Sequence, residues 1–293
     1  MTQPIIKIKF TKGFGNNLFQ YVFCRLLAER QGFLLSHDAI PALNVPRQIY
    51  SFSNGLKLRY IKDIRKDNPN GLLNYKKLLK EKLNKNYNYS ILGYFEDYTI
   101  YKPYLKKIKS WFADIPKNNT KDLALHIRLG DRLLCANSYK DFISPEKYFA
   151  VLSSIKFQKL FIVTDIDKWD YIDKKYIQGI RKEERKERRR KKIPPNDYPI
   201  LSPKKAVNYF NELIKILKEF NPILVNHKKF IDDFNFIRRF DKIIITFSTF
   251  AWWAAVLSHA NQVGIYKFWR PHKGIRNKNL GKTDYPGWFS WGS

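Results

Sequence analysis

The chain has 293 residues, 44% of them hydrophobic and 16% aromatic, and carries a formal net charge of +29. This composition is typical of a packed globular protein and excludes global disorder, and the length favours two domains. The charge raises nucleic-acid binding, but the densest basic run, residues 181–192, holds nine basic and three acidic residues and supplies only +6 of the total. Because no zinc-finger, RNA-recognition or helix-turn-helix pattern is present, we expect no nucleic-acid partner.

The N-terminal residues lack the charged and apolar regions of a secretory signal, and no apolar run approaches the roughly 20 residues that cross a bilayer. Cys24 and Cys135 give neither a disulfide framework nor metal-ligand spacing. We therefore expect a soluble, cytoplasmic protein without a membrane span. Its charge leaves peripheral contact with an anionic surface, or with a diphosphate ligand, open.

Apolar runs of strand length alternate with runs of helical periodicity along the chain, which predicts an α/β fold with parallel strands. The first unit is a strand at 5–10, a glycine turn, and a helix through 18–29; a further helical Leu pattern lies in the Lys- and Asn-rich segment 72–88. The later strands are expected at 123–127, 160–164 and 242–247, and the later helices at 145–153 and 206–220.

A polar, Pro-containing stretch at 115–120 precedes the second strong strand. The boundary is placed there, giving an N-terminal α/β domain over 1–117 and a C-terminal Rossmann-like domain over 118–293. The dense charge run within 179–195 is interpreted as a solvated surface insertion of the second domain.

The glycine turn after the first strand is suited to holding an anion. Gly13, Phe14 and Gly15 bring backbone N–H groups and a helix N-terminus to one place, and glycines allow a phosphate to approach closely. Asn16 either caps the helix with its side-chain oxygen or donates its amide to a phosphate. We therefore expect all four residues at a nucleotide site.

A second turn follows the apolar strand at 123–127. Arg128 has the fixed fork of donors that matches a diphosphate and keeps its charge near neutral pH. His126 either contacts the nucleotide or is a satisfied interior histidine, and Asp131 either pairs with Arg128 or Arg132 or acts as a base. Arg128 is the first candidate for catalysis.

A third turn offers small hydroxyls after the strand at 242–247. Ser248, Thr249 and Phe250 stand at an expected helix N-terminus, where hydroxyl and N–H groups suit a second phosphate contact. Trp252 and Trp253 follow, and adjacent aromatic residues on a helix mostly bury area. Both Trp side chains are therefore predicted to pack in the core.

These turns belong to five blocks that resemble, in order, motifs of the α-1,2-fucosyltransferase family, with the protein O-fucosyltransferases as more distant relatives. The family's G-G-L-G-N-Q-M-F-Q-Y-A-F opening resembles residues 13–23, and its H-x-R-R-G-D motif resembles 126–131. Its G-Y-[FW]-Q, F-S-D-D-x-x-W and N-S-S-F-S-W-W segments resemble residues 93–96, 163–169 and 247–253.

The resemblance implies a GT-B fold, two Rossmann-like domains facing across a cleft, with the acceptor on the N-terminal side. It implies an inverting glycosyltransferase that needs no metal and moves a sugar, L-fucose from GDP-fucose as first candidate, to a hydroxyl of an oligosaccharide or glycoprotein glycan. Arg128 would contact the donor diphosphate and help it depart, and Asn16 and Asp165 would also reach the donor. Glu96 and Asp131 are the candidate bases.

Three alternatives stay open. Leu129 and Phe247 stand where family members carry Arg and Asn, so the same fold could use another donor such as UDP-xylose. Asp165 and Asp167 form a D-x-D after an apolar strand, a place where a metal-dependent GT-A transferase holds Mn²⁺ or Mg²⁺ against a diphosphate. A sugar- or RNA-binding protein without turnover is the third.

Overall fold

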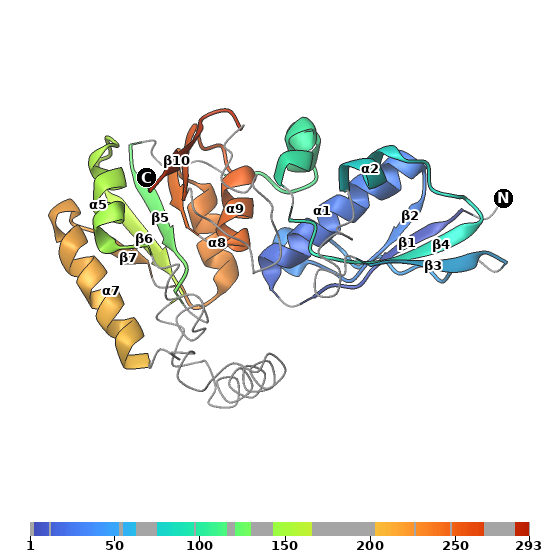
Figure 1. Ribbon diagram of the computed structural model, residues 1–293, viewed down its shortest axis with the longest axis horizontal. Helices are drawn as coiled ribbons and strands as arrows, with labels where there is room; N and C mark the ends of the chain where they lie inside the picture. The colour runs from blue at the N-terminus through green and yellow to red at the C-terminus, as the bar shows by residue number, and fades with distance from the viewer. Residues whose placement is uncertain are drawn as a thin grey trace, which may run out of the picture.

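The chain is α/β, with two sheets in which every neighbouring pair of strands is parallel (Figure 1). The expected domain boundary at 117/118, the charge run at 179–195, Asp131 and Asp167 lie outside the described residues. The computed structural model describes residues 3–11, 13–52, 55–62, 75–96, 98–115, 121–129, 143–165, 203–225, 227–246, 248–266 and 285–292.

The first sheet contains four strands in the order β2-β1-β4-β3, all of them before residue 93. Its inner strands are therefore β1 and β4, whose carboxyl ends lie side by side. α1 (Phe14–Gln31) follows β1, and α2 (Tyr75–Lys80) precedes β4. The strands are β1 (Ile5–Ile8), β2 (Leu34–Ser36), β3 (Lys57–Lys62) and β4 (Tyr87–Leu92).

The second sheet has the order β10-β9-β8-β5-β6-β7. Numbered along the chain from β5, this is 3-2-1-4-5-6 read from β7, the strand order of the Rossmann fold. The chain leaves the adjacent strands β5 and β8 in opposite directions, and such sheets bind ligands at the carboxyl ends of that strand pair. The strands are β5 (Leu123–Ile127), β6 (Leu160–Thr164), β7 (Ile223–Val225), β8 (Lys242–Ile245), β9 (Gln262–Tyr266) and β10 (Trp288–Trp291).

Helices cover both faces of the second sheet. α5 (Pro145–Ser153) and α7 (Pro203–Leu217) lie on one face, while α8 (Phe230–Arg238) and α9 (Thr249–Val256) lie on the other, between the sheet and α1 (Figure 1). The side chains of β8 therefore point alternately to the two faces. Ile244 joins the core under α5 and α7, whereas Ile243 and Ile245 join the core under α8 and α9. The short α3 (Leu105–Lys109) connects the two sheets, and 3-10 turns occur at Pro41–Leu43, Tyr98–Ile100, Lys102–Tyr104 and Lys218–Phe220.

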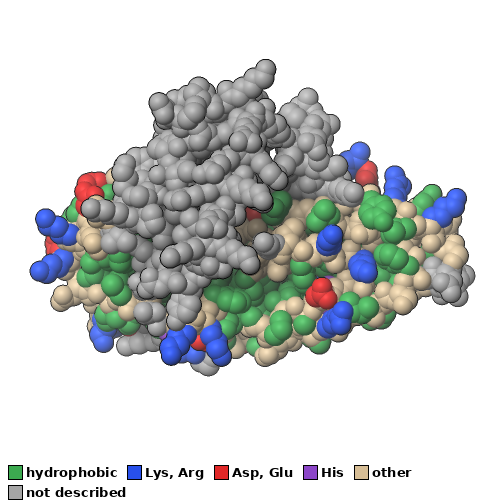
Figure 2. Space-filling model, turned by 90° about the horizontal axis from the view of Figure 1, so that it is seen from below, with side chains coloured by type: hydrophobic (Ala, Val, Ile, Leu, Met, Phe, Trp, Pro, Cys, Tyr) green, Lys and Arg blue, Asp and Glu red, His purple; other side chains and the backbone are tan. Residues whose placement is uncertain are grey.

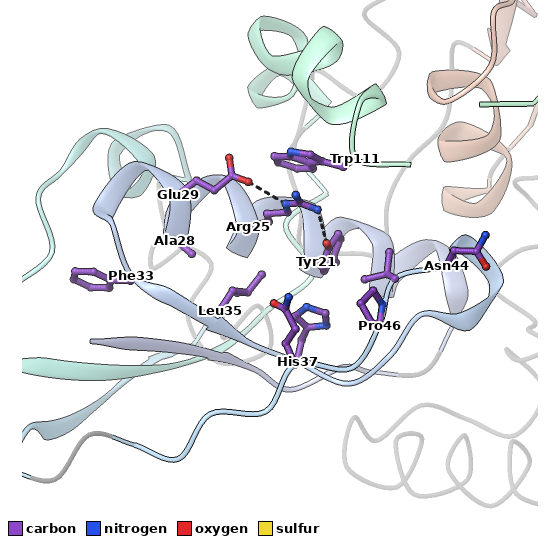
Figure 3. A pocket seen from close by; sticks show the side chains of 12 residues that line it. Tyr21, Arg25, Ala28, Glu29, Phe33, Leu35, His37, Asn44, Pro46 and Trp111 are labelled. Carbon is purple, nitrogen blue, oxygen red and sulfur yellow. Dashed lines mark hydrogen bonds and ion pairs between the residues drawn. The ribbon is translucent and has the colours of Figure 1, made fainter. Parts of the chain in front are cut away.

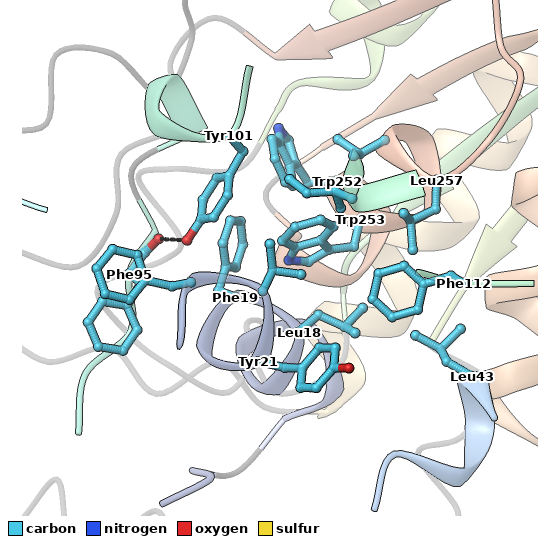
Figure 4. Close-up of a cluster of buried hydrophobic side chains, with 14 of the residues drawn as sticks. Leu18, Phe19, Tyr21, Leu43, Phe95, Tyr101, Phe112, Trp252, Trp253 and Leu257 are labelled. Carbon is cyan, nitrogen blue, oxygen red and sulfur yellow. Dashed lines mark hydrogen bonds between the residues drawn. The ribbon is translucent and has the colours of Figure 1, made fainter. Parts of the chain in front are cut away.

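Buried aromatic side chains join α1 to α9 (Figure 4). The Phe19 ring stacks on Trp252 with centroids 5.0 Å apart and lies 4.9 Å from Trp253, and the Tyr101 ring lies 5.6 Å from Trp253. Trp252 and Trp253 are 1% and 0% exposed, which confirms the prediction that both pack in the core. One cluster of buried side chains consequently runs from the first sheet through α1 to α8, α9 and the second sheet.

A polar clasp adds a second connection between the halves. Arg238 of α8 is 3% exposed and donates to the carbonyl oxygens of Ala113 (2.8 Å) and Leu257 (3.3 Å). Burial lowers the pKa of Arg238 to about 10, so the side chain stays charged at neutral pH. At the rim of the clasp the His259 imidazole hydrogen-bonds the Asp114 carboxylate.

We expect acid to weaken this clasp. The hydrogen bond from His259 lowers the pKa of Asp114 below its ordinary value. A carboxyl with a lowered folded-state pKa contributes stability that is fully present above its unfolded pKa, about 3.9 for Asp, and is lost as pH falls through the folded value. The urea-unfolding free energy of Asp114→Asn should therefore fall less steeply below about pH 4 than that of the parent chain. Identical slopes would exclude Asp114 from the acid response.

The visible surface carries its charge without a single basic stripe. Lys and Arg side chains of the described residues are scattered over the face in Figure 2, and the basic run at 181–192 lies outside those residues. Apolar side chains of the edge strand β3 also reach this protein's surface, since Leu58 is 40% and Tyr60 62% exposed. No helix in the described part of the chain has the length and apolar character needed to span a bilayer.

The elements differ from expectation where strands are short or polar. In the segment 72–88, expected to be helical, the described residues 75–88 form the six-residue α2 and then enter β4. Asn88 sits at the centre of the sheet, 0% exposed, because its Oδ1 accepts the Ile5 N–H at 3.1 Å. Asn88 made this segment look too polar for an inner strand, although its side chain is hydrogen-bonded to the neighbouring strand.

Candidate switch-point site

The polar turns predicted from the sequence meet at the carboxyl ends of β5, β6 and β8. The order in which strands are added to the sheet reverses between the parallel neighbours β5 and β8, so this is the position where a doubly wound sheet binds ligands. The N-terminus of α1 reaches the same position from the first sheet. We call this the switch-point site, and its residues are Asn16, Arg128, Asp165, Thr246, Ser248 and Thr249.

Arg128 is held by its backbone and by its side chain. Its N–H donates to Thr246 Oγ1 at 3.2 Å, which ties the end of β5 to the end of β8. Its Nε lies 3.2 Å from Asp165 Oδ2, while Leu129 N–H donates to Asp165 Oδ1 at 2.8 Å. The Arg128 side chain is nevertheless 34% exposed, so the guanidinium is oriented yet accessible to a ligand.

Asp165, which the sequence had placed only at the donor, is thus a partner of Arg128. Asp131 and Arg132, between which the sequence left the pairing open, lie outside the described residues. Asp165 follows β6, and β6 neighbours β5, so the two side chains leave adjacent strand ends. No group of three or more His, Cys, Asp or Glu side chains that could hold a metal ion occurs in the described ranges.

The N-termini of α1 and α9 meet at the site. Thr249 Oγ1 donates to Asn16 Oδ1 at 3.0 Å, although 233 positions separate the two residues. A Cβ on Gly15 would lie 2.5 Å from Phe250 N and 2.6 Å from Thr249 Oγ1. The glycine thus permits the close approach of the α9 backbone, and two helix ends with partial positive charge face one region.

Asn16 does not cap its helix. α1 begins at Phe14, with Gly13 at the N-cap in a conformation, φ 98°, that glycine adopts readily. Asn16 lies inside the first turn and uses its side chain across the helix–helix contact instead. At α9 the cap is Ser248, whose Oγ accepts the Ala251 N–H at 3.3 Å, so the predicted helix start after the third turn is confirmed.

Aromatic and imidazole rings line the site from the side of α8. His126 is 5% exposed, and its ring lies 5.8 Å from that of Phe250. Phe14 packs edge-on against Phe234 at 5.0 Å and lies 5.2 Å from Phe230. Phe14 and Phe250, both assigned to the nucleotide by sequence, therefore take part in an aromatic cluster that supports the two helix ends.

Glu96 stands at the carboxyl edge of the first sheet, whereas Arg128 and Asp165 stand at that of the second. Phe95, just before it, has a left-handed backbone with φ 53°, which is uncommon for a bulky side chain. Packing holds this conformation: the Phe95 ring stacks on Phe23 at 4.3 Å, and its carbonyl oxygen accepts the Tyr101 hydroxyl at 2.7 Å. The direction in which the chain enters Glu96 is thus fixed by the core.

Thr246, a residue of the site, and Asn17, in the first turn of α1, were not singled out from the sequence. Thr246 is 2% exposed and its hydroxyl, besides accepting from Arg128, donates to the His126 carbonyl at 3.3 Å. Asn17 buries its Oδ1 without a hydrogen-bond partner among the described residues. A polar residue directly after a buried strand was the available signal for Thr246, and none existed for Asn17.

We expect Thr246→Val to loosen Arg128 without disrupting the core. Val preserves the shape of Thr but leaves the Arg128 N–H and the His126 carbonyl without this partner, a loss of about 1–2 kcal/mol in unfolding free energy. Urea unfolding measures it, and Thr246→Ser, which keeps the hydroxyl, is the control. A loss in Thr246→Ser but not in Thr246→Val would instead assign the effect to the methyl group.

Comparison of the sequence with models of protein families and with curated proteins gave no match. The function of the switch-point site is therefore inferred from its own residues. They combine a guanidinium, an amide, hydroxyls and two helix N-termini, which is a set of groups that binds an anion with several oxygens.

Proposed function

We propose that the protein is an inverting glycosyltransferase of GT-B type, which binds a nucleotide sugar at the switch-point site and transfers the sugar to a hydroxyl of a glycan. The observation that carries the proposal is the convergence of Asn16, Arg128 and the α9 N-terminus from two sheets. Diphosphates bind where helix N-termini and an Arg fork meet at strand ends. The blocks that resemble fucosyltransferase motifs make GDP-fucose the first donor to test.

The proposed reaction is an in-line displacement at the anomeric carbon. The acceptor oxygen forms the new glycosidic bond while the bond from the anomeric carbon to the diphosphate oxygen breaks. The acceptor hydroxyl proton passes to a base, and the electron pair of the broken bond leaves with the nucleoside diphosphate. Attack from the face opposite the leaving group inverts the anomeric carbon.

Negative charge grows on the diphosphate as it departs, and groups already aimed at that charge lower the barrier. Arg128 supplies a full positive charge, and Asp165 positions its Nε. The N-termini of α1 and α9 add partial positive charge.

Glu96 is the described candidate for the base, and Asp131 is the second candidate. A base of modest strength suffices when the leaving group has largely departed before the proton moves. In the rival GT-A mechanism Asp165 would hold a metal ion. Here both Asp165 oxygens accept from protein N–H groups, those of Arg128 and Leu129, which supports a positioning role instead.

A panel of GDP- and UDP-sugars tested by thermal shift identifies the donor. A ligand at about 100 times its dissociation constant stabilises the folded chain by about 2.7 kcal/mol. We expect a GDP-sugar, with GDP-fucose first, to raise the melting temperature. The same nucleotide sugar should then be consumed when oligosaccharide acceptors are added in the presence of EDTA. Stabilisation by a UDP-pentose instead would identify that nucleotide sugar as the donor. Activity lost in EDTA would favour the metal-dependent rival, and an inert panel would contradict the proposal.

A further inference from the structure

A cavity of about 400 Å³ lies along the middle and C-terminal part of α1, apart from the switch-point site (Figure 3). Tyr21, where it begins, follows Asn16 by five residues and so lies about 7.5 Å farther along the helix axis. The volume falls within the range of roughly 300–1,000 Å³ in which proteins bind small ligands. Its lining residues are Tyr21, Arg25, Ala28, Glu29, Phe33, Leu35, His37, Asn44, Val45, Pro46, Gln48 and Trp111.

Arg25 forms a fixed polar wall of the cavity. Its Nε donates to Glu29 Oε1 at 3.0 Å, its Nη1 donates to the Tyr21 hydroxyl at 2.7 Å, and its guanidinium lies 4.3 Å from the centre of the Trp111 ring. Lys107 holds Glu29 from the other side, with Nζ 2.6 Å from Oε2. A guanidinium fixed at three sides is preorganised, so little freedom is lost when its remaining donors bind a ligand.

The charges around the cavity disfavour a cationic ligand. Arg25 and Lys107 outnumber the single carboxylate Glu29, whose pKa is held below its ordinary value by their hydrogen bonds against the effect of burial. Burial lowers the pKa of His37 and raises that of Tyr21, so both rings are neutral at neutral pH. The wall thus offers hydrogen-bond donors, its lining charges Arg25 and Glu29 balance, and Lys107 adds a positive charge behind Glu29.

The opposite wall combines amides with apolar carbon. Asn44 and Gln48 lie on the segment after β2, which is tied down because the backbones of His37 and Gln48 exchange hydrogen bonds of 2.7 and 3.0 Å. Asn44 has a left-handed backbone with φ 55°. Leu35 and Pro46 also line the cavity and give it apolar surface (Figure 3).

We propose that this cavity binds one saccharide unit of a glycan. A pyranose ring has apolar C–H faces and a rim of hydroxyls, and it therefore needs apolar surface beside planar groups that contact two neighbouring oxygens at once. Arg25, Asn44 and Gln48 are such planar groups. Arg25 serves either a pair of hydroxyls or the carboxylate of an acidic sugar. The inference does not depend on the proposed transfer reaction.

Saturation-transfer NMR of the intact chain with a panel of neutral and acidic oligosaccharides tests the proposal. We expect at least one member to bind, and Arg25→Lys to weaken it at least tenfold because the fork and its stacking on Trp111 are lost. Arg59→Lys is the matched control, since Arg59 stacks on Tyr87 at 5.9 Å on another part of the sheet. Whether acidic or neutral members bind identifies which oxygen atoms Arg25 contacts.

A second variant keeps the test valid if Arg25→Lys misfolds. Asn44→Gly removes the amide at a position whose backbone suits glycine, and Asn221→Gly, at φ 48° outside the cavity, is its control. We expect several-fold weaker binding only in Asn44→Gly, and unchanged binding in Arg128→Ala. Binding that persists in both cavity variants, or an inert panel up to about 10 mM, would overturn the proposal.

Discussion

Arg128→Ala should lower the rate of sugar transfer by roughly 10²–10³, which corresponds to about 3–4 kcal/mol of lost transition-state stabilisation. The guanidinium is the only full positive charge that the described part of the switch-point site aims at the diphosphate. Asp165 orients it at 3.2 Å, and the neighbouring strand end holds its backbone. The loss should appear in the turnover number more than in donor affinity, because charge on the leaving group develops only as the bond breaks.

The same substitution should leave the fold intact, since the Arg128 side chain is 34% exposed. Thermal unfolding of the variant checks this, and Arg59→Ala controls for the removal of one positive charge elsewhere. Asp165→Asn should lower activity by a smaller factor, because Arg128 then loses its orienting charge but keeps its own. Near-normal turnover in Arg128→Ala would remove this residue from the mechanism.

Gly15→Ala should destabilise the protein by about 3 kcal/mol, at the upper end of the range for overpacking a buried site. The new methyl group would lie 2.5 Å from Phe250 N and 2.6 Å from Thr249 C, and backbone atoms cannot rotate away as a side-chain tip can. The N-termini of α1 and α9 must therefore separate. Transfer activity should fall as well, because the Asn16–Thr249 hydrogen bond is broken by that separation.

Gly32→Ala separates these two effects. Gly32 has no atom within 4 Å of an added Cβ, but its φ is +67°, so Ala there strains the backbone without touching the site. We expect a stability loss of about 1–2 kcal/mol and normal transfer. Comparing urea unfolding and activity in the two variants decides whether α1 must approach α9 for function. Full activity in a folded Gly15→Ala protein would show that it need not.

The strands beside the switch-point site could be predicted from the sequence, whereas the sheet edges and the inner strands β4 and β9 could not. β5, β6 and β8 are continuous apolar runs ended by polar residues, and α5 was predicted with its observed bounds, Pro145–Ser153. β2 and β7 have three residues each, too few for any periodicity, and they lie at sheet edges. β3 has the sequence Lys-Leu-Arg-Tyr-Ile-Lys. It is an exposed edge strand, and without a buried face its sequence gives little indication of a strand.

The candidate site could be predicted as a set of turns but not as a set of contacts. Asn16, Arg128 and Ser248 carry amide, guanidinium and hydroxyl groups in turns after apolar strands, and this pattern favours anion binding. The pairing of Arg128 with Asp165 depends on β5 and β6 being neighbours, which is a property of strand order and not of either segment alone. The left-handed backbone of Phe95 is likewise a product of packing, since nothing in the local sequence requires it.

The aromatic core between α1 and α9 limits how substrates can enter. Swinging the halves apart would bring Phe19, Trp252 and Trp253 into water, and each aromatic side chain buries about 150–250 Å², worth about 4–6 kcal/mol at about 25 cal/mol per Å². Such an opening approaches the whole stability of an ordinary domain. The proposed donor would then have to enter, and its product leave, with the two sheets moving as one piece.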